Sequence, residues 1–304
     1  MSVESHLAEL ERRHEALKRE IQEAQTHPGF DEFEVAALKK RKLHLRDKVP
    51  FYTVVTDPCD GFWRGWACHD VDHYFVASEE AKNQLVDFGI GSHKISIAGM
   101  PVHSRFRPAA MDEKMAMRQA MGLDPEKFTV FLNAGWVGGG NMAKIYEELT
   151  RSDLDIQAVF LAGQNERLLR EAHQMAGSAS FPVKVMGYTD EIHSVMNASD
   201  IMVSKLGGLT TFEALACQLP IIGDCVTPPM PQEAQTARFI ESKGTGLLLE
   251  KPDGIVSVVQ SIMQSPHRLE EMRQAALVHA SAGAADRIAR GVLNQIQLQP
   301  GQNN

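Results

Sequence analysis

The chain has 304 residues, enough for one large domain or two small ones, and its 43% of hydrophobic residues can fill a substantial core. Its formal net charge of -8 disfavours a nucleic-acid partner, because phosphate backbones reward clustered lysines and arginines. The polar first residues contain no apolar signal segment, and no apolar run approaches the roughly 20 residues of a membrane span, so we expect a soluble cytoplasmic protein.

Neither the cysteines nor the acidic residues are spaced like metal ligands. The four cysteines, Cys59, Cys68, Cys217 and Cys225, form no CxxC pair, so we expect free thiols in a reducing compartment. Asp153-Leu154-Asp155 has the DxD form of metal-dependent transferases. It falls in a helix-to-strand connection, however, where a solvated turn is the simpler interpretation. We therefore expect no metal and no other bound cofactor.

The first 50 residues predict an α-helical hairpin. An a/d seam with alternating spacings of three and four runs through Leu7, Leu10, His14, Leu17, Ile21 and Ala24. It breaks at the turn signal of residues 27–30, and a second amphipathic stretch follows with Val35, Leu38, Lys42, Leu45 and Val49 on one face. The segment resembles the small bacterial YdcH-like helical-hairpin proteins.

Two roles are open for this hairpin. Its seam would either dock on a partner protein or a second copy of the chain, or close on itself. The basic run of residues 39–42 is either a solvated face or a contact for anionic lipid headgroups.

Beyond residue 50, short β-branched runs alternate with amphipathic helical patterns, which is typical of a parallel sheet covered on both faces. Strands are expected at 51–55, 73–78, 94–99, 128–135, 156–163, 183–187, 200–205 and 220–224. Helices are expected at 78–89, 141–152, 166–177 and 232–244, and a helical tail at 254–296. We predict an α/β protein with three parts: the hairpin at 1–50, a segment at 51–110, and a Rossmann-like parallel-sheet domain at 111–300.

Ligands of open parallel sheets bind at the carboxyl ends of the strands, and two of the loops there are rich in glycine. The turn from Gly135 to Asn141 could bring backbone N–H groups to a phosphate at a helix N-terminus, although glycine turns also serve simple packing. In the loop from Ser204 to Ala214, Thr210 or Thr211 can cap the following helix, while Gly207 and Gly208 open the backbone towards a diphosphate.

Two further features of these loops have more than one interpretation. Glu213 is either a favourable first-turn charge or capping-box residue, or a carboxylate that accepts ribose hydroxyls. In the loop from Pro228 to Gln235, Gln232 and Glu233 stand at a predicted helix start, where they could bind sugar hydroxyls or simply begin the helix.

Taken together, residues 54–249 resemble the C-terminal half of family 28 glycosyltransferases of the GT-B fold. The likeness is to the monogalactosyldiacylglycerol synthases and the related bacterial diacylglycerol glucosyltransferases. It runs through VVTD (54–57), DHYFVASEEAKNQLVDFGI, KISIAGMPV, the glycine-rich turn, GYTDEIHSVMNASDIMVSKLGGLTTFEALACQLPII, PQE and FIESKGTG.

The resemblance implies a role for each matching position in binding UDP-sugar. The diphosphate would be held by Gly135, Gly138, Gly140, Gly207, Gly208, Thr210 and Thr211, with Lys205 in the same loop. Glu213 would bind ribose, Gln232 and Glu233 would face the sugar, and Met186-Gly187-Tyr188 would lie near uracil.

The resemblance also implies an acceptor-binding domain before the donor domain. Residues 51–110 resemble only the end of that domain, and the hairpin stands where the rest would be. The catalytic base is unknown. Asp60 is a weak candidate, because it takes the place of a histidine that relatives commonly carry, while we expect His69 and His73 to be surface or helix-end residues.

The function implied is that of a UDP-sugar-dependent, inverting hexosyltransferase, of which this chain is the donor-binding half. Its acceptor would be a lipid or a lipid-linked molecule at the inner face of the membrane, reached alone or with a separate acceptor-domain protein. The alternative is a non-catalytic nucleotide-sugar-binding module or pseudoenzyme that regulates a partner. A sugar-nucleotide 2-epimerase shares the fold, but the VVTD and GMPV segments favour the transferases.

Overall fold

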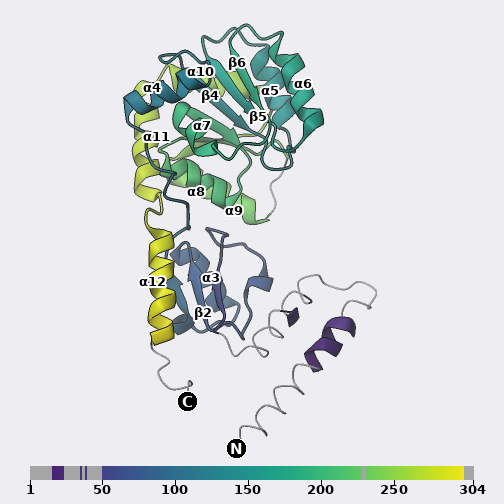
Figure 1. Cartoon of the computed structure of the whole chain (residues 1–304), viewed down its shortest axis with the longest axis vertical. Coiled ribbons are helices and arrows are strands. Elements are labelled where there is room, and N and C mark those ends of the chain that lie inside the picture. The colour runs from purple at the N-terminus through teal and green to yellow at the C-terminus, as the bar shows by residue number, and fades with distance from the viewer. Residues whose placement is uncertain (1–15, 24–34, 36–37, 40–49, 228–230, 298–304) are drawn as a thin grey trace, which may run out of the picture. The chain divides into compact units, whose positions relative to one another are not determined.

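The computed structural model describes residues 16–23, 35, 38–39, 50–227 and 231–297 (Figure 1). By contacts the chain divides into two units, residues 1–99 with 286–304, and residues 100–285. Most of the predicted hairpin lies outside the description. Within it, residues 16–23 are helical as expected, and the seam residues Leu17 and Ile21 and the second-stretch residue Val35 are buried.

The first unit contains a parallel sheet in the order β1-β2-β3 in its described part. Its elements are β1 (Tyr52–Val54), η1 (Arg64–Trp66), β2 (His73–Val76), α3 (Glu79–Asp87), η2 (Ser92–Lys94), β3 (Ile95–Ile97) and the part of α12 (Ala284–Gln297) from Asp286 onward. Helix α3 begins where Ser78 accepts a hydrogen bond from the Ala81 N–H group. Helix α12 packs on the sheet at Gly291, where a β-carbon would come within 2.5 Å of the Phe75 ring.

The second unit is a parallel sheet with helices on both faces. Its strands are β4 (Thr129–Asn133), β5 (Gln157–Leu161), β6 (Val183–Met186), β7 (Ile201–Ser204), β8 (Ile221–Asp224) and β9 (Gly246–Leu249). Its helices are α4 (Met111–Ala120), α5 (Met142–Thr150), α6 (Glu166–Ala176), α7 (Ile192–Ala198), α8 (Gly208–Ala216), α9 (Pro231–Ser242), α10 (Gly254–Met263) and α11 (Pro266–His279).

Burial follows from this layered arrangement. Strands β4 and β5 are buried along their whole length, as expected for inner strands covered on both sides. Val130 and Leu132 point into one core cluster with side chains of α5, α6 and α10, while Phe131 between them faces the opposite side of the sheet. Figure 1 shows α5 and α6 beside β5 and β6.

The prediction of an α/β protein with a Rossmann-like parallel sheet is confirmed, and all eight predicted strands are present. Strand β9 was missed. Contacts place the division at residue 99 and again at 285, whereas the sequence placed domain boundaries at 110 and 300. The functional division into domains stays a prediction.

Candidate functional site

The two glycine-bearing turns begin side by side in the second unit. The sheet order is β6-β5-β4-β7-β8-β9, so the chain moves outward from β4 to β6 and then returns to β7 on the other side of β4. Strands β4 and β7 pair in parallel up to their last residues, Asn133 and Ser204. A reversal of strand order leaves a crevice at the carboxyl ends, which is where open α/β sheets bind ligands.

The first turn, residues 134–141, takes a shape that requires glycine. Gly138 has a φ of 58°, and a β-carbon on it would lie 2.4 Å from the Ala162 carbonyl oxygen. The turn is held from both sides, because the Gly135 N–H group donates to Asn133 Oδ1 and the Asn165 amide donates to the Gly138 carbonyl. A cavity of about 250 Å³ borders the turn on the side of α6.

The second turn leads directly into α8, and here one prediction is wrong. The helix begins at Gly208 with Gly207 as its N-cap and no side-chain cap, so Thr210 and Thr211 lie inside the helix and do not cap it. Within the described residues, the N–H groups of Gly208, Leu209 and Thr210 have no recorded acceptor. They are the donors that every helix start leaves open.

Glu213 lies in the second turn of α8, because the helix starts at Gly208. The interpretation as a first-turn or capping-box charge is therefore wrong. Burial raises the pKa of Glu213 to about 7, and the guanidinium of Arg105 partly opposes this shift. In the described part of the chain no hydrogen bond or ion pair reaches the carboxylate, which leaves it able to accept hydroxyl donors of a ligand.

The predicted uracil segment follows β6 at the same edge of the sheet. Met186 ends the strand, and the Tyr188 ring packs edge-on against the Trp136 ring of the first turn, with centroids 5.0 Å apart. Both rings are largely exposed, at 50% and 59%. Trp136 was not among the predicted site residues; an aromatic residue inside a glycine-rich turn was the available signal.

The predicted sugar-facing residues lie at the start of α9, which follows β8. Residues 228–230 and the Gln232 side chain lie outside the described part of the structure. Glu233 stands in the first turn of α9 and is half-buried.

The second unit is similar to a known protein family. Residues 141–288 match the family model of the glycosyltransferase family 28 C-terminal domain, a range that begins just after the glycines of the first turn and includes the whole of the second. Residues 7–49 match a second family, described as a protein of unknown function (DUF465).

The curated relatives of the chain include processive diacylglycerol β-glucosyltransferases. That of Bacillus mycoides is 28% identical over 80% of this chain and 61% of its own length. That of Bacillus pumilus is 27% identical over 74% of this chain and 57% of its own length. The chain thus spans about three-fifths of the length of these relatives.

Solved structures show the GT-B fold for this chain. Anabaena HepE in complex with UDP-glucose gives a TM-score of 0.59 at 13% identity, covering 86% of this chain and 77% of that one. Acinetobacter baumannii MurG gives 0.63 at 12% identity, with coverages of 86% and 71%. The UDP-GlcNAc 2-epimerase of Neisseria meningitidis gives 0.62 at 17% identity, with coverages of 86% and 73%.

The residues considered for base catalysis lie outside the residues that match the family 28 model, in the first unit. Asp60 is exposed, in a turn fixed by a hydrogen bond from the Gly61 N–H group to Gln84. His69 is exposed as expected. The expectation for His73 is wrong: it is the first residue of β2, it is buried, and its ring lies 2.8 Å from the Ser96 hydroxyl. Burial, with a smaller contribution from His93, lowers its pKa.

The remaining features of the described chain are its cysteines, its helix lengths and its acidic residues. All four cysteines are free. Among the residues that the structure describes, no helix is both long and apolar enough to cross a membrane, and no group of three or more potential ligand side chains is placed to hold a metal. Asp153 and Asp155 lie in an exposed connection between α5 and β5.

Sequence reasoning missed one residue beside the crevice. Asp224 is the last residue of β8, and its carboxylate accepts hydrogen bonds from the Asn141 N–H group and side-chain amide at 3.3 to 3.4 Å. An acid that ends a buried strand on the ligand side of a parallel sheet was the signal that could have found it.

Proposed function

We propose that the chain binds a UDP-sugar and transfers its hexosyl group, with inversion, to a hydroxyl of a lipid acceptor. The observation that carries the proposal is the pairing of β4 with β7, which starts both glycine-bearing turns at one crevice. The open N–H groups at the start of α8 suit a diphosphate, because a helix N-terminus carries partial positive charge. Glu213 stands one and a half turns further along the same helix and suits the ribose hydroxyls.

In the proposed reaction the acceptor hydroxyl oxygen attacks the anomeric carbon. The bond from that carbon to the phosphate oxygen breaks, its electron pair leaves with UDP, and the hydroxyl proton passes to a general base. The negative charge that develops on the diphosphate is stabilised by backbone amides and the α8 N-terminus, which are fixed before the reaction begins. We propose that this stabilisation needs no metal. The catalytic base is unknown, and Asp60 is a weak candidate for it.

The acceptor is inferred from the relatives, whose names specify diacylglycerol. We propose a lipid hydroxyl at the cytoplasmic face of a membrane as the acceptor of this chain. A separate acceptor-domain protein, docked through the N-terminal hairpin or elsewhere, would complete the reaction if the chain does not act alone.

The direct test incubates the full chain with radiolabelled UDP-glucose, UDP-galactose or UDP-GlcNAc and vesicles that contain diacylglycerol, with and without cell extract. We expect label in the lipid fraction with one of the donors. UDP binding without any sugar transfer, even with extract present, would favour the non-catalytic binding module. Epimerisation of UDP-GlcNAc at C2 without transfer would favour the epimerase.

The ribose assignment is tested in the same preparation. Glu213→Ala should weaken UDP binding about tenfold or more, because two hydroxyls lose a charged acceptor. Glu148→Ala, which removes an exposed α5 glutamate paired with Arg151, is the matched control and should leave the affinity unchanged. Equal UDP affinity in Glu213→Ala and wild type would remove Glu213 from the site.

A further inference from the structure

Exposed apolar side chains gather at the carboxyl edge of the second sheet. The registers place the last residues of β6, β5, β4 and β7 next to one another along this edge. Large hydrophobic side chains that stay exposed follow three of these strand ends: Trp136, Val137, Tyr188 and Leu209. In the described part of this unit, the other exposed large hydrophobic side chains lie on α4 and α11: Met111, Leu277 and Val278.

The backbone of the first turn presents Trp136 and Val137 in a fixed position. The Trp136 carbonyl accepts a hydrogen bond from the Gln164 N–H group at 2.8 Å, and a β-carbon on Gly163 would come within 2.4 Å of the same oxygen. Val137 is 69% exposed, and neither side chain belongs to the hydrophobic core of the unit. Turns favour glycine, asparagine, aspartate and serine. An apolar pair at this place therefore serves neither the turn nor the core.

The aromatic part of this surface is amphipathic. The Trp136 ring packs edge-on against the Tyr188 ring, and the Tyr188 hydroxyl donates to Asp190 at 2.5 Å. Tryptophan and tyrosine combine an apolar ring with a polar tip, and both are enriched where a membrane meets water. The pair therefore suits the boundary between water and a lipid layer.

The proposed acceptor and the charge of the chain both favour lipid as the occupant of this surface. A lipid hydroxyl can react only where its lipid layer comes up to the crevice, and the exposed apolar side chains stand beside that crevice. The net charge of -8 means that anionic headgroups repel the chain as a whole. Apolar contact attaches a protein to a lipid layer without relying on charge.

We propose that Trp136 and Val137, with Tyr188 and Leu209 beside them, form a lipid contact surface on the second unit. These side chains enter the interface of a bilayer and so bring acceptor hydroxyls to the open edge of the crevice. The inference rests on the proposed function. It adds a contact with lipid to the unit to which that proposal assigns only the donor.

The test measures how the full chain partitions onto vesicles of phosphatidylcholine and diacylglycerol, by sedimentation. The double variant Trp136→Ser/Val137→Asn should partition about tenfold more weakly, because two apolar side chains lose their burial in lipid. Its melting temperature should stay that of the wild type, since both side chains are exposed in the folded chain.

The matched control is Leu277→Ser/Val278→Asn on α11. These residues are also consecutive, apolar and exposed, at 47% and 75%. The control should partition as the wild type does. Equal partitioning of wild type and Trp136→Ser/Val137→Asn would overturn the inference, and so would an equal loss in both double variants.

Tryptophan fluorescence gives a second measurement on the same vesicles. The chain has three tryptophans, and lipid with brominated acyl chains should quench a part of the wild-type emission that is missing in Trp136→Phe. The same quenched fraction in both proteins would show that Trp136 stays in water, contrary to the inference.

A short-chain diacylglycerol dissolved in water separates the two proposals. Sugar transfer to this acceptor by a wild-type chain that does not bind vesicles would leave the proposed function standing and overturn the lipid contact. No transfer to either acceptor, with vesicle binding lost only in Trp136→Ser/Val137→Asn, would overturn the proposed function and support the lipid contact.

Discussion

At the scale of single residues, the glycine positions and Glu213 could be predicted because their chemistry is local. A glycine-rich strand-to-helix turn and an acid just inside a helix are visible in consecutive residues. Asp224 and Trp136 carried weaker local signals and were missed. Their contacts are with Asn141 and Tyr188, which the fold brings from other loops.

The raised pKa of Glu213 makes a prediction about stability. A folded-state pKa of about 7 against an ordinary value of 4.5 means that folding favours the protonated form. The stability from this group is complete below about pH 4.5 and is lost as the pH rises through 7. Glu213→Gln cannot ionise, so its stability relative to wild type should grow from pH 4.5 to pH 8 by on the order of 1 kcal/mol, a figure reduced for partial exposure.

Urea unfolding of both proteins across this pH range measures the difference. Glu148→Gln on the exposed face of α5 is the control and should show no such growth. A difference between Glu213→Gln and wild type that stays flat with pH would mean that the carboxyl is solvated in the folded protein.

At the scale of elements, hydrophobic runs located most strands, but the ends of elements and the strand at the edge of the sheet were harder to predict from the sequence. Strand β9 reads Gly-Leu-Leu-Leu, without the β-branched residues that marked the other strands, and it lies at the edge of the sheet. The predicted threonine caps failed because Gly207 already supplies the extended conformation that begins α8. His73 was misjudged although a strand was predicted from residue 73, because its polar neighbours suggested a surface position and the strand is buried from its first residue.

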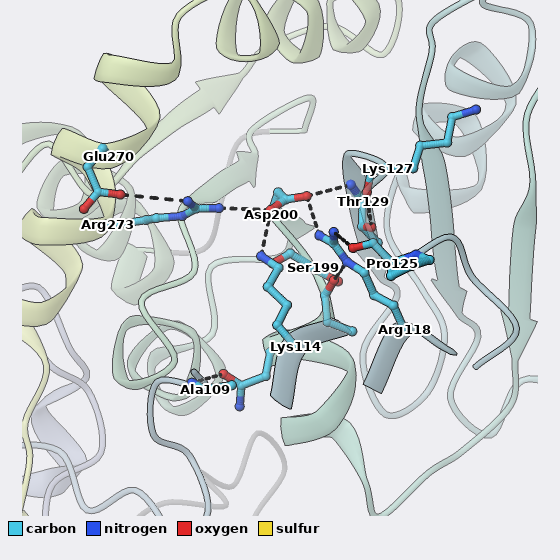
Figure 2. Close-up of polar contacts among 12 residues, drawn as sticks. Ala109, Lys114, Arg118, Pro125, Lys127, Thr129, Ser199, Asp200, Glu270 and Arg273 are labelled. Atoms are coloured by element: carbon cyan, nitrogen blue, oxygen red, sulfur yellow. Dashed lines mark hydrogen bonds and ion pairs between the residues drawn. The ribbon is translucent and has the colours of Figure 1, made fainter. Parts of the chain in front are cut away.

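Elements far apart in the sequence are joined by a charged cluster at the amino end of β7, shown in Figure 2. The Asp200 carboxylate forms ion pairs with Lys114 at 2.7 Å, Arg118 at 2.6 Å and Arg273 at 3.0 Å. It also accepts a hydrogen bond from the Thr129 N–H group. These contacts tie α4 and α11 to the sheet. The sequence could not predict them, since the partners are 71 to 86 residues from Asp200.

Asp200→Asn should lower the free energy of unfolding by about 3 kcal/mol, because it leaves buried cations without their counter-charge. Burial alone would raise the pKa of Asp200, but Lys114 and Arg118, with hydrogen bonds from Lys114 and Thr129, outweigh it and hold the pKa below its ordinary value. The carboxylate thus stabilises the fold above the unfolded-state pKa, and this contribution disappears as the pH falls through the depressed value.

The Asp200 prediction is tested by chemical denaturation at pH 7 and at acidic pH. Asp155→Asn, at an exposed acid paired with Lys127, is the control and should cost less than about 0.5 kcal/mol. A loss for Asp200→Asn no greater than that of the control would show that the cluster contributes nothing net.

At the scale of the whole molecule, the alternation of strands and helices predicted a parallel sheet, but not the order of its strands. That order decides where the site lies, because it sets β4 beside β7 and so joins turns that are 70 residues apart in the chain. All of the described candidate donor residues belong to the second unit. Our proposal therefore assigns donor binding to that unit.

The central claim is tested most directly by a crystal structure of the full chain with UDP. Our account predicts the diphosphate at the N–H groups that begin α8, beside the turn from Gly135 to Asn141, with both ribose hydroxyls on the Glu213 carboxylate. UDP bound at another edge of the sheet, or with its ribose away from Glu213 and the start of α8 empty, would contradict it.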